Sequence, residues 1–237
     1  MAVPPTPQSP SVPGSPWLPS LGGRFIVFDG PDGSGKSTQV RRFVEHAKAS
    51  GVELLQVREP GGTALGERVR ALLLDPSNGE LDVRAELLLY MASRAQLVAQ
   101  RIRPALAQGR LVLADRFISS TLAYQGTAGG VPYEDIHRMG EIVLGDCWPD
   151  LTVVFDVDEA TAAARMNPLL RGREFGGDLD RMEMKGVAYH RRVREGFLRQ
   201  VREDPARHLL LDARGSEAEV WGLLIDGLAA WAGTLQA

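Results

Sequence analysis

The feature that most constrains this chain is a glycine-rich turn between a short apolar run and an amphipathic helical pattern. Residues 24–29, Arg-Phe-Ile-Val-Phe-Asp, indicate a strand, and residues 30–37, Gly-Pro-Asp-Gly-Ser-Gly-Lys-Ser, follow directly. Apolar residues then recur at helical spacing from Val40 to Ala47. The turn matches G-x-x-x-x-G-K-[ST] at every fixed position, in the strand, turn and helix context that phosphate binding requires. We therefore predict a P-loop fold that binds a nucleoside triphosphate.

Each part of this turn has a physical role in holding phosphate. Its glycines let successive backbone N–H groups point inward, and the start of the following helix adds positive potential. Lys36 would place a charge on the outer phosphates, and Ser37 could bind Mg²⁺. The predicted nucleotide-binding residues are Gly30, Pro31, Asp32, Gly33, Ser34, Gly35, Lys36, Ser37 and Thr38.

The rest of the chain alternates apolar runs with helical patterns. The further predicted strands are residues 52–58, 110–115, 151–156 and 208–212, and the predicted helices include residues 65–74 and 80–108. Strands that alternate with helices and are apolar on both faces are typical of a parallel sheet covered by helices. The predicted fold class is α/β, with a five-stranded parallel sheet. Four of the runs end in an aspartate, at the sheet edge where such folds bind ligands: Asp29, Asp115, Asp156 and Asp212.

Composition limits the partners and the compartment. The net charge of −3 gives no general positive potential for nucleic acid, so an anionic partner must be bound locally. No run of about 18 apolar residues predicts a membrane span. The single cysteine, Cys147, cannot form an internal disulfide, which fits the cytoplasm.

The first 23 residues differ from the rest. They contain no charged residue and seven of the 15 prolines, and they lack the basic start and apolar run of a secretory signal. We predict a disordered leader over residues 1–23, with a partner-binding arm as the alternative, and one domain over residues 24–237.

A P-loop does not identify the phosphate acceptor, so a switch GTPase, an ATPase coupled to motion and a small-molecule kinase compete. The guanine-reading Asn-Lys-x-Asp segment is absent, which disfavours the GTPase. A kinase needs a second pocket, and arginines and aromatic residues do cluster where that pocket would lie. They occur in residues 58–63 with Arg70, in the pair Tyr90 and Arg94, and in residues 115–125.

These segments resemble the thymidylate kinase family. The matching motifs, within residues 24 to 212, are Phe-Asp-Gly-Pro-Asp-Gly-Ser-Gly-Lys-Ser-Thr, Arg-Glu-Pro-Gly-Gly-Thr, Tyr-Met-Ala-Ser-Arg, Asp-Arg-Phe-Ile-Ser-Ser-Thr-Leu-Ala-Tyr-Gln-Gly and Asp-Leu-Asp-Arg-Met-Glu. The resemblance implies phosphorylation of dTMP to dTDP with ATP and Mg²⁺, in a homodimer formed through the long helices. A kinase for another deoxynucleoside monophosphate, or a P-loop ATPase that acts on a partner, stays an alternative.

The resemblance also implies roles for particular residues. Asp32 would accept from the deoxyribose 3′-OH, Tyr124 would exclude a 2′-OH, and Ser37 with Asp115 would hold Mg²⁺. Tyr90 would stack on thymine, although beside three leucines it also fits a core position. The implied substrate-binding residues are Asp32, Glu59, Arg70, Tyr90, Arg94, Arg116, Thr121, Tyr124 and Gln125.

A lid is predicted over residues 166–178, a glycine-containing stretch with no clear period. Some family members carry an arginine in the P-loop, but Gly33 stands there in this chain, so Arg171 or Arg173 of the lid would serve instead. A basic surface loop is the alternative. With these two arginines, the implied catalytic set is Lys36, Arg116, Arg171 and Arg173.

Overall fold

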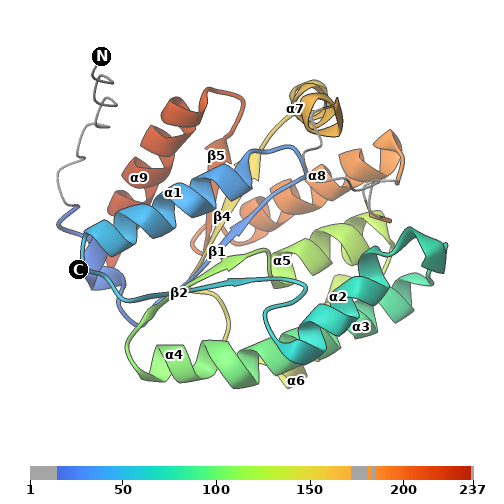
Figure 1. Cartoon of the computed structure of the whole chain (residues 1–237), viewed down its shortest axis with the longest axis horizontal. Helices are drawn as coiled ribbons and strands as arrows, with labels where there is room; N and C mark the ends of the chain where they lie inside the picture. The colour runs from blue at the N-terminus through green and yellow to red at the C-terminus, as the bar shows by residue number, and fades with distance from the viewer. Residues whose placement is uncertain (1–14, 172–180, 183–184, 236–237) are drawn as a thin grey trace, which may run out of the picture.

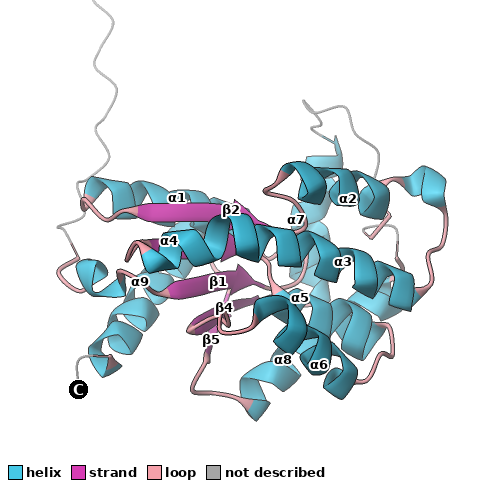
Figure 2. Ribbon diagram, turned by 90° about the horizontal axis from the view of Figure 1, so that it is seen from below, coloured by secondary structure: helices cyan, strands magenta, loops and turns pink. Residues whose placement is uncertain are grey.

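A computed structural model describes residues 15–171, 181–182 and 185–235 of the chain. Within them, five parallel strands form one sheet in the order β2-β3-β1-β4-β5, and Figure 2 shows them side by side. The strands are β1 (Phe25–Asp29), β2 (Leu54–Arg58), β3 (Leu111–Asp115), β4 (Leu151–Asp156) and β5 (His208–Asp212). All five lie inside the predicted runs, and the predicted fold class is confirmed.

Helices connect the strands and cover both faces of the sheet. They are α1 (Lys36–Ala49), α2 (Ala64–Leu74), α3 (Val83–Leu97), α4 (Arg103–Ala107), α5 (Ile118–Thr121), α6 (Tyr133–Leu144), α7 (Glu159–Arg171), α8 (Val187–Glu203) and α9 (Glu217–Thr234). A π-helical turn, η3 (Val98–Ile102), joins α3 to α4, so the helix predicted over 80–108 is nearly continuous. A second π-helix, η4 (Leu122–Ala128), continues α5.

The two faces of β1 belong to different hydrophobic layers. Ile26 and Phe28 pack in a cluster with residues of α1 and α9, whereas Phe25 and Val27 pack in a cluster with residues of α3, α4 and α6. This alternation follows from the period of two residues in a strand. Figure 1 shows α1 and α9 on one side of the sheet and α3, α4 and α6 on the other.

The strand register brings the carboxyl ends together. Asp115 pairs with Phe28 of β1 on one side and with Arg58 of β2 on the other. β1 and β3 are neighbours in the sheet, and the chain leaves β1 toward β2 on one side but leaves β3 toward β4 on the other side, so the two connections run in opposite directions from this pair of strands. Crevices at such points are where open α/β sheets bind ligands.

The predicted leader is too long. Residues 15–23 belong to the fold, because the 3-10 helix η1 (Leu18–Leu21) places both of its leucines, fully buried, in the cluster with Phe43 of α1 and Leu228 of α9. Residues three apart in a 3-10 helix lie on one side, which allows this burial. The Ser15 hydroxyl also lies 3.0 Å from His46 Nε2. The composition of the segment could not show that its two leucines pack against a surface formed by α1 and α9. Residues 1–14 lie outside the described part of the chain.

The start of the predicted lid is helical. Residues 166–171 form the end of α7, where the preceding alanine-rich sequence has high helix propensity. Residues 172–178 lie outside the described part of the chain. No helix in the described residues has both the length and the apolar character that a membrane crossing needs.

Candidate active site

Backbone geometry in the P-loop explains two of its glycines. Gly30 has φ 145°, and a Cβ there would lie 2.5 Å from the carbonyl oxygen of Phe155. A Cβ at Gly33, which has φ 78°, would lie 2.8 Å from the carbonyl oxygen of Ala162 in α7. An arginine at position 33 is therefore disfavoured by both the backbone conformation and the space.

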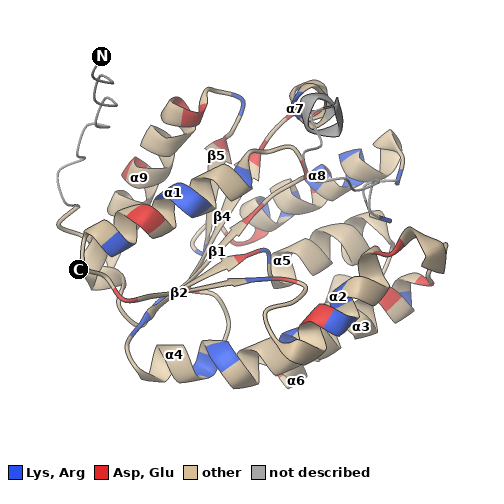
Figure 3. Ribbon diagram, in the orientation of Figure 1, with Lys and Arg blue, Asp and Glu red and all other residues tan. Residues whose placement is uncertain are grey.

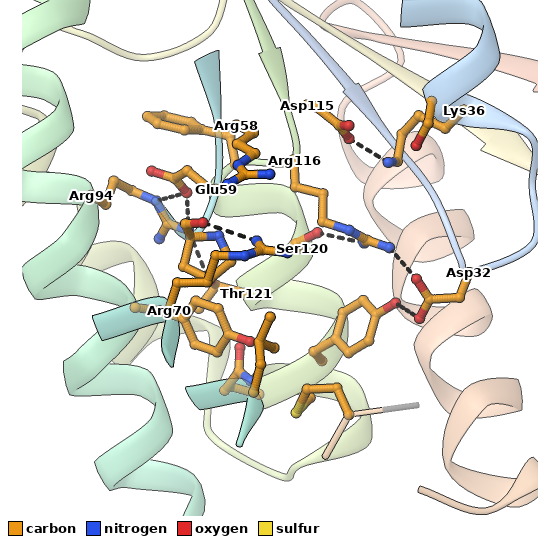
Figure 4. A pocket seen from close by; sticks show the side chains of 18 residues that line it. Asp32, Lys36, Arg58, Glu59, Arg70, Arg94, Asp115, Arg116, Ser120 and Thr121 are labelled. Atoms are coloured by element: carbon orange, nitrogen blue, oxygen red, sulfur yellow. Dashed lines mark hydrogen bonds and ion pairs between the residues drawn. The ribbon is translucent and has the colours of Figure 1, made fainter. Parts of the chain in front are cut away.

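Lys36 is the first residue of α1 and is buried, with 7% of its surface exposed. Its ammonium group pairs with Asp115 at the tip of β3, which Figure 4 shows opposite it. Ser37 and Asp115 line the same cavity and supply the oxygen ligands that suit Mg²⁺, an ion that keeps several of its waters. In the described residues, no cluster of three or more His, Cys, Asp or Glu side chains could hold a metal.

Arg116 follows β3 with φ 68°, a left-handed conformation that is unusual for a residue with a side chain. Its guanidinium donates to Asp32 Oδ1 at 2.5 Å, to the Gly30 carbonyl at 3.1 Å and to the Ser120 hydroxyl at 3.1 Å. The strained backbone thus directs this cation across the P-loop, next to the phosphate cradle.

Asp32 accepts from both Arg116 and the Tyr124 hydroxyl, the latter at 2.9 Å. Burial by itself raises the pKa of Asp32, but the Arg116 guanidinium and the Tyr124 hydroxyl outweigh burial, so the pKa lies below its ordinary value. Burial also raises the pKa of Tyr124 well above its ordinary value. Asp32 is therefore a carboxylate and Tyr124 a neutral donor at physiological pH.

A fully buried carboxylate, Asp29, fixes the segment that carries Arg116. It accepts from the hydroxyls of Ser119 at 2.5 Å and Ser120 at 2.7 Å and from the backbone N–H of Gly30 at 2.9 Å. These bonds join the end of β1 to the start of α5. The sequence placed Asp29 at the sheet edge but gave no indication of this anchoring role.

A second cation, Arg94 of α3, is 1% exposed. Its Nε donates to Glu59 Oε2 at 2.7 Å, and its Nη2 donates to Thr121 Oγ1 at 3.0 Å. Burial raises the pKa of Glu59 to about 7, although the Arg94 guanidinium opposes this shift. In the described part of the chain, Glu59 Oε1 has no hydrogen-bond partner. The predicted pair of Tyr90 and Arg94 on one helix face is confirmed, and both line the cavity.

These side chains surround one cavity of about 360 Å³. Every residue predicted to bind the acceptor lies in its wall, with Lys36, Ser37 and Asp115 at the P-loop end. Tyr90 is half-buried and faces this cavity, which distinguishes it from a core residue. Lining residues for which the sequence suggested no role are Arg58, Pro60, Leu74, Phe117, Ser120 and Met182.

Some predicted residues lie elsewhere. Six members of the predicted nucleotide site form the loop and the start of α1 outside the cavity wall: Gly30, Pro31, Gly33, Ser34, Gly35 and Thr38. Arg171 is the last residue of α7, and its side chain lies outside the described structure. Arg173 also lies outside the described residues.

Chemically, the cavity can hold two anionic groups side by side. Three of the cationic side chains that line it form ion pairs with carboxylates: Lys36 with Asp115, Arg116 with Asp32, and Arg94 with Glu59. Arg70 of α2 also lines the cavity and donates to the Pro60 carbonyl at 3.0 Å. Planar guanidinium groups from three separate segments suit a phosphate monoester.

Comparison with known proteins shows the family to which the chain belongs. The sequence model of the family described as thymidylate kinase matches residues 28–221. A thymidylate kinase from Syntrophotalea carbinolica is 44% identical over 199 residues, which is 83% of this chain and 90% of that protein. A thymidylate kinase from Pseudomonas syringae pv. tomato is 46% identical over 198 residues, or 84% of this chain and 91% of that protein.

A solved structure agrees with these sequence matches. The crystal structure of thymidylate kinase from Ehrlichia chaffeensis superposes with a TM-score of 0.69 and 33% identity, and the match covers 87% of this chain and 98% of that one.

Proposed function

Because the chain belongs to the thymidylate kinase family, we propose that its cavity holds dTMP beside the γ-phosphate of ATP and transfers the phosphoryl group with the residues described above. The enzyme phosphorylates dTMP to dTDP with ATP as the donor. One observation carries the assignment of the site: Arg70, Arg94 and Arg116, from three different segments, line one cavity with Lys36 of the P-loop.

At the donor end, the P-loop backbone and Lys36 bind the β- and γ-phosphates of ATP. Ser37 and Asp115 would hold Mg²⁺, which neutralises charge on the phosphate oxygens. The ion pair between Lys36 and Asp115 keeps the ammonium group at the mouth of the loop. Lys36 therefore lies between the two bound nucleotides.

At the acceptor end, the three arginines hold the 5′-phosphate of dTMP. Asp32 accepts from the 3′-OH, and Tyr124 occupies the space that a 2′-OH would need. Tyr90 stacks on the thymine ring, and Thr121 and Gln125 bind the base edge. The support for these roles is that all of these residues line one cavity.

The transfer needs no general base. The second pKa of a phosphate monoester is about 6, so the attacking oxygen of dTMP is already largely ionised at neutral pH. Catalysis then consists of alignment of the two phosphates and neutralisation of charge. Arg116 and Lys36 supply cations inside the described structure, and Arg171 or Arg173 of the lid would add another when the lid closes.

The test is a coupled assay of ADP formation with dTMP, dUMP, dCMP, dGMP and AMP as acceptors. The proposal predicts the highest kcat/KM with dTMP. A preference for another monophosphate would favour the alternative kinase. ADP formation that is independent of any acceptor would favour the P-loop ATPase.

A substitution of Lys36 separates the donor role from acceptor recognition. Lys36→Ala should lower kcat by about a hundredfold with every acceptor, because it removes charge stabilisation in the transition state. A Lys36→Ala enzyme that keeps wild-type kcat would show that this lysine does not act on the transferred phosphate.

We also propose a homodimer and a cytoplasmic location. The outward side of α3 and η3 carries the exposed residues Leu88 and Ala92 of α3 and Ala99 of η3, and α2 packs against α3 with Leu65 and Leu72 exposed. An apolar surface of this kind, on the helix that also carries Tyr90 and Arg94, supports pairing of two chains through their long helices.

A further inference from the structure

Glu86 of α3 is a fully buried carboxylate that lies behind the cavity wall. It precedes Tyr90 and Arg94 at intervals of four residues, so the three side chains share one face of the helix. Tyr90 and Arg94 line the cavity. Glu86 is not among the lining residues, but it contacts Gln125, which is one of them. None of the roles proposed above uses this carboxylate.

The two oxygens of Glu86 have different partners. Oε1 accepts from Arg181 Nη1 at 2.5 Å and from Lys185 Nζ at 3.2 Å. Oε2 accepts from the side-chain amide of Gln125, Nε2, at 3.2 Å. Arg181 is itself held by the carbonyl of Leu73, to which its Nε donates at 2.9 Å. One oxygen thus binds cations, and the other binds the amide of a cavity residue.

This contact fixes the direction of the Gln125 amide. A carboxylate can only accept, so the NH₂ end of the amide must face Glu86 and the carbonyl end must face away. Gln125 is 2% exposed and lines the cavity. The contact with Glu86 uses Nε2 of the amide and leaves its Oε1 to face other groups. Gln125 therefore offers the cavity an acceptor.

We propose that Glu86 is a positioning residue for base selection. By holding Nε2 of Gln125, it makes Oε1 the acceptor for the ring N3–H of an imide base such as thymine or uracil. Cytosine has no hydrogen at ring N3, so the same oxygen would face an acceptor and leave both groups unpaired. This inference rests on the proposed function, in which Gln125 lies at the base edge.

The experiment compares kcat/KM for dTMP, dUMP and dCMP in the wild type and in Glu86→Gln, with ATP in excess. A glutamine at position 86 can donate as well as accept, so the Gln125 amide is free to adopt either direction. We expect the dTMP to dCMP ratio of kcat/KM to fall about tenfold, the size of one mismatched hydrogen bond. The dTMP to dUMP ratio should not change, because both bases have the imide edge.

Two further variants isolate the contact. Lys185→Met removes a partner of Oε1 but leaves the Oε2 contact with Gln125, so its acceptor ratios should match those of the wild type. In a Gln125→Leu background there is no amide to orient, and adding Glu86→Gln should then leave the dTMP to dCMP ratio unchanged. If Glu86→Gln does not fold, Glu86→Asp keeps a carboxylate for Arg181 with a shorter reach toward Gln125, and the same shift in the ratio is expected.

The outcomes separate this inference from the function on which it rests. A wild-type enzyme with no preference for dTMP over dCMP would contradict the proposed acceptor. A wild type that prefers dTMP, with a Glu86→Gln variant that loses activity by the same factor on all three acceptors, would show that Glu86 only stabilises the fold and would overturn the inference.

Discussion

At the scale of single residues, the site stores backbone strain at Arg116. A left-handed conformation costs a residue with a Cβ on the order of 1–3 kcal/mol, and glycine avoids that cost. We predict that Arg116→Gly is more stable than Arg116→Ala by about 1 kcal/mol, although both lose activity. Denaturant unfolding of the two variants measures the difference.

The matched control is the exposed Arg138 in α6, which has ordinary helical geometry. There the order should reverse, because glycine in a helix interior costs about 1 kcal/mol relative to alanine. Equal stability of the two Arg116 variants would mean that the strain is relieved elsewhere in the loop.

The buried carboxyl group of Glu59 makes the stability of the fold depend on pH. Its folded pKa is raised from 4.5 to about 7, so between these values the folded chain binds a proton that the unfolded chain has released. The free energy of unfolding should therefore fall as pH rises from about 4.5 to about 7, and then level off. A shift of this size corresponds to about 3 kcal/mol.

Urea unfolding of the wild type and of Glu59→Gln between about pH 5 and pH 8 tests this linkage. Glutamine cannot titrate, so the wild type should lose stability relative to the variant as pH rises. A constant difference between the two proteins across this range would contradict the raised pKa.

The site residues that could be predicted from the sequence are those in motifs that are contiguous along the chain. The P-loop, the pair Tyr90 and Arg94, and Asp115 with Arg116 all belong to this class. Glu86 and Asp29 act through partners far away in sequence, such as Arg181, and a buried carboxylate has no local signal that names its partners. Their roles needed the tertiary structure.

At the scale of elements, the strands were predictable to within two residues because each is a short apolar run closed by a polar residue. The π-helical turn at Val98–Ile102 was not, because its sequence has ordinary helical character. η1 was missed for a different reason. Its burial depends on a surface formed by α1 and α9, and α9 is the last helix of the chain.

The η1 segment changes what a truncation should do. Removal of residues 1–20 deletes Leu18, which is fully buried, so this truncation should lower the melting temperature, whereas removal of residues 1–14 leaves the whole of η1 in place. In the full chain, Leu18→Ala should cost about 3 kcal/mol of unfolding free energy. Thermal and urea unfolding of the three proteins measure these effects.

Pro16→Ala provides a control for the same segment, because Pro16 is exposed and its substitution should change stability by less than about 0.5 kcal/mol. A Leu18→Ala variant as stable as Pro16→Ala would show that η1 does not dock on the core in solution.

At the scale of the whole molecule, one helix connects the cavity to the surface proposed for dimerisation. α3 presents Tyr90 and Arg94 to the cavity and Leu88 to solvent, where 60% of the leucine is exposed. Figure 3 shows mainly Lys and Arg, with few Asp and Glu, along α1 and α8, and like charges disfavour the pairing of such a helix with a second copy of itself. The apolar surface on α3 and α2 is therefore the stronger basis for pairing of two chains.

We predict that Leu88→Arg converts a dimer to a monomer, because a buried contact between two helices would then contain two unpaired cations. Light scattering coupled to size exclusion should report about half the wild-type mass. Leu223→Arg is the matched control, since Leu223 is 47% exposed on α9, in the layer on the opposite face of the sheet, and its mass should equal that of the wild type. A wild-type chain that is already monomeric, or a mass change with Leu223→Arg instead, would remove α3 from the interface.

If Leu88→Arg alone dissociates the dimer, the KM of this variant for dTMP should also rise, because the helix that carries Tyr90 and Arg94 would lose its support on the outer side.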